Sequence, residues 1–249
     1  MKMAPLTRYL TYQIYHALQL LAKITQESDT EHLHQFRVAI RRSRSLLRLY
    51  LPEYYALHEV LRSIVRQTNI LRELDVFTAS VDPHDYPKLV KLLQAYRSEQ
   101  FESVLTEQFR KQTRSTLTKL YDDLTELNPA LPAEELIDAA EKHFDGCLAG
   151  YNTLTKKSSE EELHELRIRF KISRYALEFL DQSALHSEQE KIKSCKKIQD
   201  HLGAVQDASN QFHFLKSFCR SHLIHECRRL LKARKSQLKQ LKKLTVSSR

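Results

Sequence analysis

Two stretches of the sequence carry the same series of basic residues at helical spacing. In each stretch a histidine is followed by basic residues three, seven and ten positions later: His34, Arg37, Arg41 and Arg44, and again His164, Arg167, Lys171 and Arg174. Successive residues of an α-helix are rotated by about 100°, so four such positions fall within roughly 80° of one another and cover about 15 Å of the axis. Each series therefore predicts one basic stripe along one helix face.

The stripes indicate a site for an anion. Neighbouring like charges on a helix repel by about 0.2–0.5 kcal/mol per pair, and no acidic residue shares either stripe through Arg44 or Arg174. Arginine suits phosphate because its planar fork donates two parallel hydrogen bonds and keeps its charge. The alternative is a solvated helix face, the ordinary explanation for a single cation. Each stripe histidine could equally be a packed, neutral imidazole bonded to a backbone carbonyl.

The two stripes belong to an internal repeat. Residues 33–50 align with residues 163–180 at a constant offset of 130, with six of 18 positions identical and six more of the same chemical class. Apolar residues form a second stripe rotated by roughly 120° from the basic one, so the basic stripe should face away from the core. We expect a single domain over residues 1–249 made of two copies, about 1–128 and about 131–249, joined near Pro129 and Pro132.

The elements that position these stripes should be helices. Only 3 of the 249 residues are glycine, where average usage of about 7% would supply roughly 17. Glycine-rich phosphate loops, doubly wound nucleotide folds and β-barrels therefore fit poorly. Apolar periodicity and proline positions predict an all-α fold of about eight helices, with spans of 5–27, 30–51, 54–80, 86–126, 133–156, 159–182, 187–206 and 208–244.

Charge and cysteine usage narrow the class of protein further. Lys and Arg outnumber Asp and Glu by 40 to 31, a net charge of +9, which favours an anionic partner such as nucleic acid, a phospholipid surface or polyphosphate. Four cysteines at irregular spacing predict reduced, mostly buried thiols. Polar residues interrupt the first apolar run, so we expect an amphipathic helix and not a signal peptide, no membrane association and, by default, a cytoplasmic location.

The segment from His34 to Arg44, echoed from His164 to Arg174, resembles the signature of the conserved-histidine α-helical domain (CHAD) family. Leu71 to Val76 in the first half, and Leu202 to Asp207 in the second, resemble the family's Leu-Gly-x-x-Arg-Asp segment after the third helix of each repeat. The resemblance covers essentially the whole chain. It is specific because the repeat, the stripes and the third-helix segments occur together.

The resemblance implies two four-helix bundles related by a pseudo-twofold axis, with basic faces lining a shared groove or pore. It also implies binding of inorganic polyphosphate, association with polyphosphate granules, no intrinsic catalysis and no cofactor. Arg62 and Lys196 on the third helices align with each other at an offset of 134 and join the expected site. Carried over residue by residue, the polyphosphate-binding residues are His34, Arg37, Arg41, Arg44, Arg62, His164, Arg167, Lys171, Arg174 and Lys196.

This sequence departs from the family pattern at three places. Asn69 stands where the family has glycine, Gln206 stands where it has arginine, and Arg42 corresponds to Ile172 across the repeat. We therefore expect the second half of the site to be weaker or narrower. Tunnel-shaped triphosphatases often accompany CHAD modules, but no Glu-x-Glu-x-Lys run is present, so such an enzyme, or another granule protein, would be a separate partner chain.

A rival function is binding of RNA or DNA backbone phosphates by the same basic faces. Sites for single strands usually add aromatic platforms for the bases. None of the 11 Tyr and 10 Phe interleaves with the stripes, which favours a ligand made of phosphate alone. A pure scaffold is the third and weaker alternative.

Other polar patterns in the sequence are weaker evidence for a function. A basic series on the last helix could lengthen an anion track, bind RNA, or be a solvated face; it comprises Arg228, Lys232, Lys235, Lys239 and Lys242. His222 and His225 lack the His-Glu-x-x-His order and a third ligand, so we expect no metal site. Ser43 and Ser173 lie on the apolar sides of their helices and are interpreted as packing residues, not nucleophiles.

Overall fold

The computed structural model describes residues 3–155, 158–222 and 224–247, with side chains as far as Leu241. In these residues the secondary structure is ten α-helices and one short 3-10 helix, with no β-strand, as the all-α prediction requires. The helices are α1 (Pro5–Lys23), α2 (Thr30–Tyr50), η1 (Pro52–Tyr54), α3 (Tyr55–Gln67), α4 (Asn69–Ala79), α5 (Pro87–Val104), α6 (Glu107–Leu127), α7 (Ala133–Thr153), α8 (Glu160–Gln182), α9 (Gln189–Ser221) and α10 (His225–Ser247).

The helix boundaries differ from the predicted spans at three places. The span 54–80 is two helices that meet at Thr68, and the span 86–126 divides before α6. The Thr106 hydroxyl accepts a hydrogen bond from the Phe109 amide and so begins α6 as its N-cap. In contrast, no break occurs at residue 207, because α9 continues to Ser221 and buries Leu215 and Phe218 on the same helix. The predicted span 208–244 is therefore not one helix, since it comprises the end of α9 and the separate helix α10, which begins at His225.

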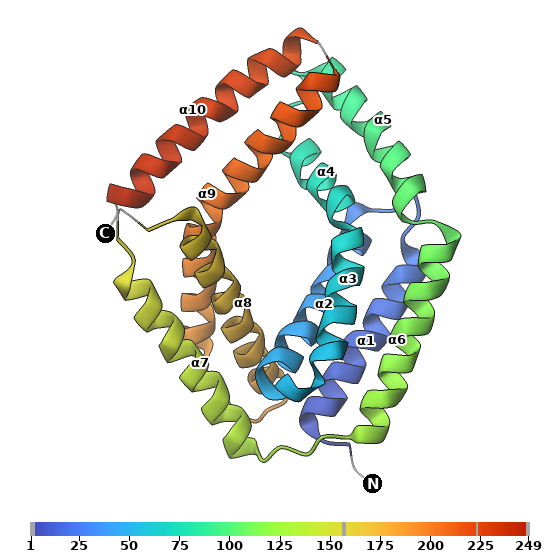
Figure 1. The fold of residues 1–249 in the computed structure, drawn as a ribbon, viewed down its shortest axis with the longest axis vertical. Coiled ribbons are helices and arrows are strands. Elements are labelled where there is room, and N and C mark those ends of the chain that lie inside the picture. The colour runs from blue at the N-terminus through green and yellow to red at the C-terminus, as the bar shows by residue number, and fades with distance from the viewer. Residues whose placement is uncertain (1–2, 156–157, 223, 248–249) are drawn as a thin grey trace.

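In the view down the shortest axis the helices form a closed ring (Figure 1). α2 and α8 pack against each other, which places the two basic stripes on adjacent helices. α1 and α3 pack on α2, while α7 and α9 pack on α8. At the far end of the ring, α5 packs on α4 and α10 packs on α9, and α10 also contacts α5.

Two separate groups of apolar side chains hold this arrangement. The main core runs through α1, α2 and α8 and buries Phe36, Phe170 and Phe179 completely. A smaller group, called the outer cluster here, joins α4 and α5 to α9 and α10; its buried members are Leu74, Phe77, Val81, Leu89, Leu93, Leu215, Phe218, Cys227 and Leu230. Because apolar burial is the main stabilising contribution, the ring is held at two ends by cores of unequal size.

Two further expectations can be compared with the structure. All four cysteines are free thiols, and three of them are buried, as their spacing suggested. Ser43 and Ser173 are fully buried packing residues, also as expected. None of the helices in the described ranges combines the length and the apolar run that a membrane span requires.

Candidate anion-binding groove

Both stripe-bearing helices have well-defined N-termini, which set where each stripe begins. The Asp29 carboxylate accepts a hydrogen bond from the Glu31 amide at 2.9 Å and caps α2. Ser159 and Glu162 form a reciprocal capping box at the start of α8. The first turn of α8 also holds three acidic residues, which favour the positive end of the helix dipole. Local sequence therefore fixes both helices one turn before the stripe histidines.

The stripes meet in a row of adjoining pockets between α2 and α8. A pocket of about 260 Å³ is lined by cations from both helices and by Arg72 from α4. A smaller pocket of about 110 Å³ shares Arg41 and Lys171 with it. A third, of about 350 Å³, shares Arg44 and Arg48 with the second. We call this row the basic groove, and its cations are Arg37, Arg41, Arg44, Arg48, Arg62, Arg72, Arg167 and Lys171.

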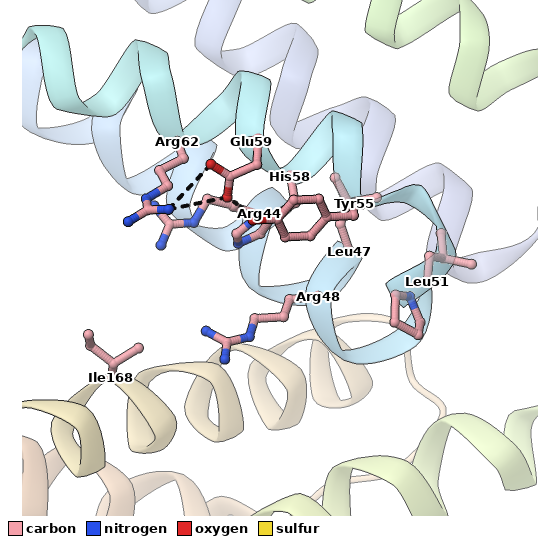
Figure 2. Close-up of a pocket in the computed structure, with 10 residues that line it drawn as sticks. Arg44, Leu47, Arg48, Leu51, Tyr55, His58, Glu59, Arg62 and Ile168 are labelled. Atoms are coloured by element: carbon pink, nitrogen blue, oxygen red, sulfur yellow. Dashed lines mark hydrogen bonds and ion pairs between the residues drawn. The ribbon is translucent and has the colours of Figure 1, made fainter. Parts of the chain in front are cut away.

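Figure 2 shows the third pocket, at one end of the groove. Arg48 extends from α2 toward α8, where Ile168 lies opposite. Among the described residues, Glu59 is the only acidic side chain that lines this pocket, and it lies 3.3 Å from Arg62 Nη1 and 3.1 Å from His58 Nδ1. Arg44 and Arg48 form no ion pair among the described residues, so this end of the groove keeps a positive charge that no acid neutralises.

Burial and mutual repulsion disfavour the charged forms of several groove residues. Burial, assisted by the charges of Arg167 and Arg41, lowers the pKa of Lys171 to about 8. Burial also lowers the pKa of Arg41, and the nearby charges of Arg72 and Arg167 lower it further. The pKa of Arg44 is lowered in the same way, by burial and by Arg62. A bound anion would supply a counter-charge that offsets the cost of burying these cations and their mutual repulsion.

Arg37 has a structural role in the fold. The residue is only 6% exposed, and Nη1 donates to the Val65 carbonyl at 2.7 Å and to the Thr68 hydroxyl at 2.6 Å. Nη2 donates to Asn69 Oδ1 at 2.7 Å. The break between α3 and α4 leaves buried acceptors that need donors, and Arg37 supplies them. The expectation that the whole stripe faces away from the core is therefore wrong at Arg37.

Arg167 is the corresponding residue on α8, but its side chain is more accessible to a ligand. Its side chain is 18% exposed, and Nη2 donates to Asp207 Oδ2 at 3.1 Å. The guanidinium lies over Gly203 of α9, where an added Cβ would be 2.8 Å from Nη2. Arg167 Nε is buried without a hydrogen-bond partner in the described part of the chain. This unsatisfied donor could be met by a ligand in the groove.

The two stripe histidines do not line the groove. His34 is half-buried, its Nδ1 has no partner among the described residues, and burial together with Arg72 lowers its pKa. His164 lines a different pocket beside α8, and partial burial together with Lys171 lowers its pKa. In both histidines the lowered pKa favours the neutral form of the imidazole.

Arg174 and Lys196 also lie outside the groove's lining. Arg174 Nε is 3.4 Å from Glu178 Oε1, and Arg42 Nη2 is 3.1 Å from Glu178 Oε2, so Glu178 joins α8 to α2. Lys196 is exposed on α9. Four residues of the basic series on α10, Arg228, Lys232, Lys235 and Lys239, are exposed and line none of the groove's pockets, and the side chain of Lys242 lies outside the described residues.

Comparison with known proteins agrees with this geometry. The sequence profile of the CHAD domain family matches residues 8–216. The chain belongs to the CHAD domain family. The crystal structure of the CHAD domain from the plant Ricinus communis superposes with a TM-score of 0.71, covering 96% of this chain and 86% of that one at 21% identity, which shows a shared fold. No curated protein sequence matches the chain.

Two groove cations of this CHAD domain were missed by sequence reasoning. Arg48 follows Arg44 by four residues and so continues the stripe by one turn, but its partner across the repeat is Glu178, and matching between copies excluded it. Arg72 stands at the arginine of the family's third-helix segment and lines the groove beside Arg41. Helical spacing was the signal that could have identified Arg48, and the third-helix motif was the signal that could have identified Arg72.

One group of residues in the CHAD domain has metal-ligand chemistry. Ligand atoms of Glu141, His186 and Glu188 lie within 4.8 Å of one another. The Lys191 ammonium group, however, donates to Glu141 at 2.9 Å and to Glu188 at 3.2 Å. A cation therefore already satisfies these carboxylates, and we interpret the group as a salt-bridge cluster.

Proposed function

We propose that this CHAD domain binds inorganic polyphosphate in the basic groove and catalyses no reaction. The observation that carries the proposal is the position of Arg41 and Lys171, which come from opposite halves of the chain and line the same two pockets. Neither forms an ion pair with an acidic residue in the described structure. A polyanion lying along the groove would contact both halves at once.

The balance of charge in the groove supports this proposal. Its three pockets are lined by eight cations and three carboxylates, those of Glu59, Glu73 and Asp207. Polyphosphate carries about one negative charge per phosphate and no intervening sugar, so its charge density matches guanidinium groups at helical spacing. The groove cations with lowered pKa values would gain a counter-charge on binding.

We also infer that the chain is one domain of two four-helix copies related by a pseudo-twofold axis. The first copy would comprise α1, α2, α3 with α4, and α5 with α6; the second would comprise α7 to α10. Arg37 contacts Asn69, and Arg167 contacts Gly203, at positions that correspond across the repeat. In this arrangement the groove lies between the copies, and the protein would associate with polyphosphate granules in the cytoplasm, beside partners such as a separate triphosphate tunnel enzyme.

One observation favours nucleic acid as an alternative ligand. Tyr55 is 63% exposed and lines the end pocket of the groove beside Arg44 and Arg62 (Figure 2). An exposed ring next to cations is a platform on which a base can stack. Of the other Tyr and Phe residues that line the groove, Phe77 and Tyr175 are buried and Phe214 is half-buried, so Tyr55 is the one fully exposed ring in the described part of the groove.

A competition experiment separates the two ligands. Labelled long-chain polyphosphate is bound to the protein and challenged with single-stranded RNA, ATP or unlabelled polymer at equal phosphate concentration. We expect only the long polymer to displace the label, because a short ligand forfeits simultaneous contacts. If RNA displaces the label and Tyr55→Ala abolishes that effect, the nucleic-acid function is correct. Competition by ATP as strong as that of the polymer would contradict both.

Matched variants then locate the site. Arg41→Gln and Lys171→Gln should each weaken binding of the long polymer about tenfold, because each removes one charge-assisted contact. Arg114 is exposed on α6, away from the groove, so Arg114→Gln removes the same charge as a control. Equal loss of affinity in all three variants would show that only net charge matters.

A further inference from the structure

A pocket of about 520 Å³ lies beside the basic groove, between α8, α7 and the end of α2. It shares Arg48 and Ile168 with the groove pocket in Figure 2, so the groove forks at Arg48. We call it the side pocket, and the residues that give it its chemistry are Arg48, His143, His164, Glu165 and Arg169. None of these except His164 belongs to the site expected from the repeat.

Arg169 is held in the side pocket by α7. Its Nη2 donates to the Gly146 carbonyl at 3.0 Å. The guanidinium lies along two glycines of α7: an added Cβ at Gly146 would be 3.3 Å from Nη2, and one at Gly150 would be 3.5 Å from Nη1. At Gly146 the absence of a side chain lets Arg169 lie close to the helix, whereas a Cβ at Gly150 would make only ordinary van der Waals contacts. No carboxylate forms an ion pair with Arg169 within the described ranges.

His143 presents one ring nitrogen to the pocket. Its Nδ1 lies 2.7 Å from the buried Ser173 hydroxyl, and Cys147 Sγ lies 3.4 Å from the same oxygen. Because Nδ1 is engaged inside the bundle, Nε2 is the nitrogen left for the pocket. Burial, with the charges of Arg169 and Arg48, lowers the pKa of His143 to about 4. The ring is therefore neutral, and Nε2 donates a hydrogen bond when Ser173 donates to Nδ1.

We propose that the side pocket binds the terminal phosphate groups of an inorganic phosphate chain, and that pyrophosphate and tripolyphosphate are its smallest ligands. Arg48 and Arg169 provide two planar forks, which suit tetrahedral oxyanions. A terminal phosphate carries a second ionisation near pH 6 and therefore more charge than an internal one. Glu165 is the only acid of the described chain that lines the pocket, and it is exposed.

The side pocket has no counterpart in the other half of the chain. Across the repeat, Arg169 corresponds to Ala39 and Arg48 corresponds to Glu178. Glu178 is paired with Arg42 and Arg174, so the equivalent surface lacks both arginines of the side pocket and carries an acid at one of the two positions. A site that occurs once marks one end of an otherwise repeated groove. If a long polymer occupies the groove as proposed above, the side pocket would hold its end and give the bound chain a direction.

Calorimetric titration with tripolyphosphate tests the side pocket directly. We expect Arg169→Gln and His143→Gln to weaken tripolyphosphate binding, by about tenfold for the arginine, and to weaken binding of long polymer much less, because only the end of the polymer would contact the side pocket. Arg41→Gln should show the reverse pattern, and Arg114→Gln should change neither. Unchanged tripolyphosphate affinity in both side-pocket variants would overturn the proposal. So would equal binding of citrate, a carboxylate anion of similar charge.

Two further measurements keep the test independent of folding and of the proposed function. Arg169→Lys keeps the charge but loses the fork, so its circular dichroism should be unchanged while tripolyphosphate binding still weakens; full retention of binding contradicts the proposal. If wild-type protein binds tripolyphosphate but no long polymer, the proposal for the side pocket holds and the proposed function of the groove is wrong.

Capping both ends of a polymer separates the two sources of terminal phosphate. If capping weakens polymer binding to the wild type but not to Arg169→Gln, the ligand of the side pocket is the end of a polymer. If capping has no effect, the ligand is a free short chain.

Discussion

The guanidinium of Arg167 lies over Gly203, so close that a Cβ atom there would be 2.8 Å from Nη2. The glycine is not needed for its backbone freedom, since it lies within α9 and no glycine in the described chain has a positive φ. Glycine is needed here because its lack of a side chain leaves space for the guanidinium. Arg167 can therefore reach Asp207 and the groove only because α9 has no side chain at this position.

Gly203→Ala should separate binding from stability. The methyl group displaces the end of a flexible side chain, so we expect polyphosphate binding to weaken about three- to tenfold. Stability should be unchanged or higher, because alanine favours a helix over glycine by about 1 kcal/mol. Gly150→Ala, whose Cβ meets only ordinary contacts at 3.4 Å and 3.5 Å, is the control. A large loss of melting temperature in Gly203→Ala would show that the contact with Arg167 cannot relax.

Arg37 and Arg41 should respond differently to the same substitution. Arg37→Met removes two buried hydrogen bonds and one partly buried hydrogen bond at the junction of α3 and α4, so we expect a loss of about 2–4 kcal/mol in unfolding free energy. Arg41→Met removes a partly buried charge without an acidic partner, so stability should not fall while polymer binding weakens. Urea unfolding measures both. Equal stability of the two variants would contradict a structural role for Arg37.

Lys171 should make the stability of the free protein depend on pH. Its folded pKa, about 8, is below its ordinary value of 10.5, so the unfolded chain binds more protons between these values. Its contribution to unfolding free energy therefore rises with pH across this window, and the cost of its buried charge is fully present below pH 8. Lys171→Met should lack this rise. Parallel stability curves for the two proteins from neutral pH to pH 10 would contradict it.

Polyphosphate binding should take up protons through the same residue. A bound polyanion favours the charged amine and raises its pKa, so at pH 8 to 9 the complex holds more protons than its separate parts. Calorimetry in two buffers of different ionisation enthalpy measures this uptake. Lys171→Met should abolish most of it, whereas Arg114→Gln should leave it unchanged.

Salt should weaken binding of the long polymer steeply, because the bound cations displace counterions. We expect the slope of log K against log salt to become shallower by roughly 0.7 for each phosphate that a variant no longer neutralises, for example in Arg41→Gln. Fluorescence titration over a range of salt concentrations gives the slope. An affinity that does not change with salt would contradict the electrostatic account of the groove.

Local sequence predicted the helices that carry the stripes because their signals are local. Asp29 and Ser159 are capping residues, and the apolar period runs unbroken through α2 and α8. The break at Thr68 could not be predicted in this way. No proline or glycine marks it, and Thr68 is stabilised there by the buried Arg37 side chain, 31 positions away in sequence. Tertiary contacts decided this boundary.

The site itself was predicted in part. Helical spacing singled out Arg41, Arg44 and Lys171, and all three line the groove. It overlooked the ion pair of Arg174 with Glu178, although the two residues are four positions apart on α8. Only the second ion pair of Glu178, with Arg42 of α2, depends on the packing of the two helices. Comparison of the two copies also hid Arg48, since the copies diverge at this position. Residues that match between the copies identify the features that the two halves share. The side pocket depends instead on residues that differ between the copies, such as Arg48 and Arg169.

The outer cluster has a consequence for how a long polymer could reach its site. Fewer buried side chains join α5 and α10 than hold α2 and α8 in the main core, so native-state hydrogen exchange should find the lowest opening free energy at the outer end of the ring. The amides of α2 and α8 would stay protected during such openings. A chain of phosphates could then enter from the side while its binding surface remains assembled, and its end would not have to be threaded between the helices.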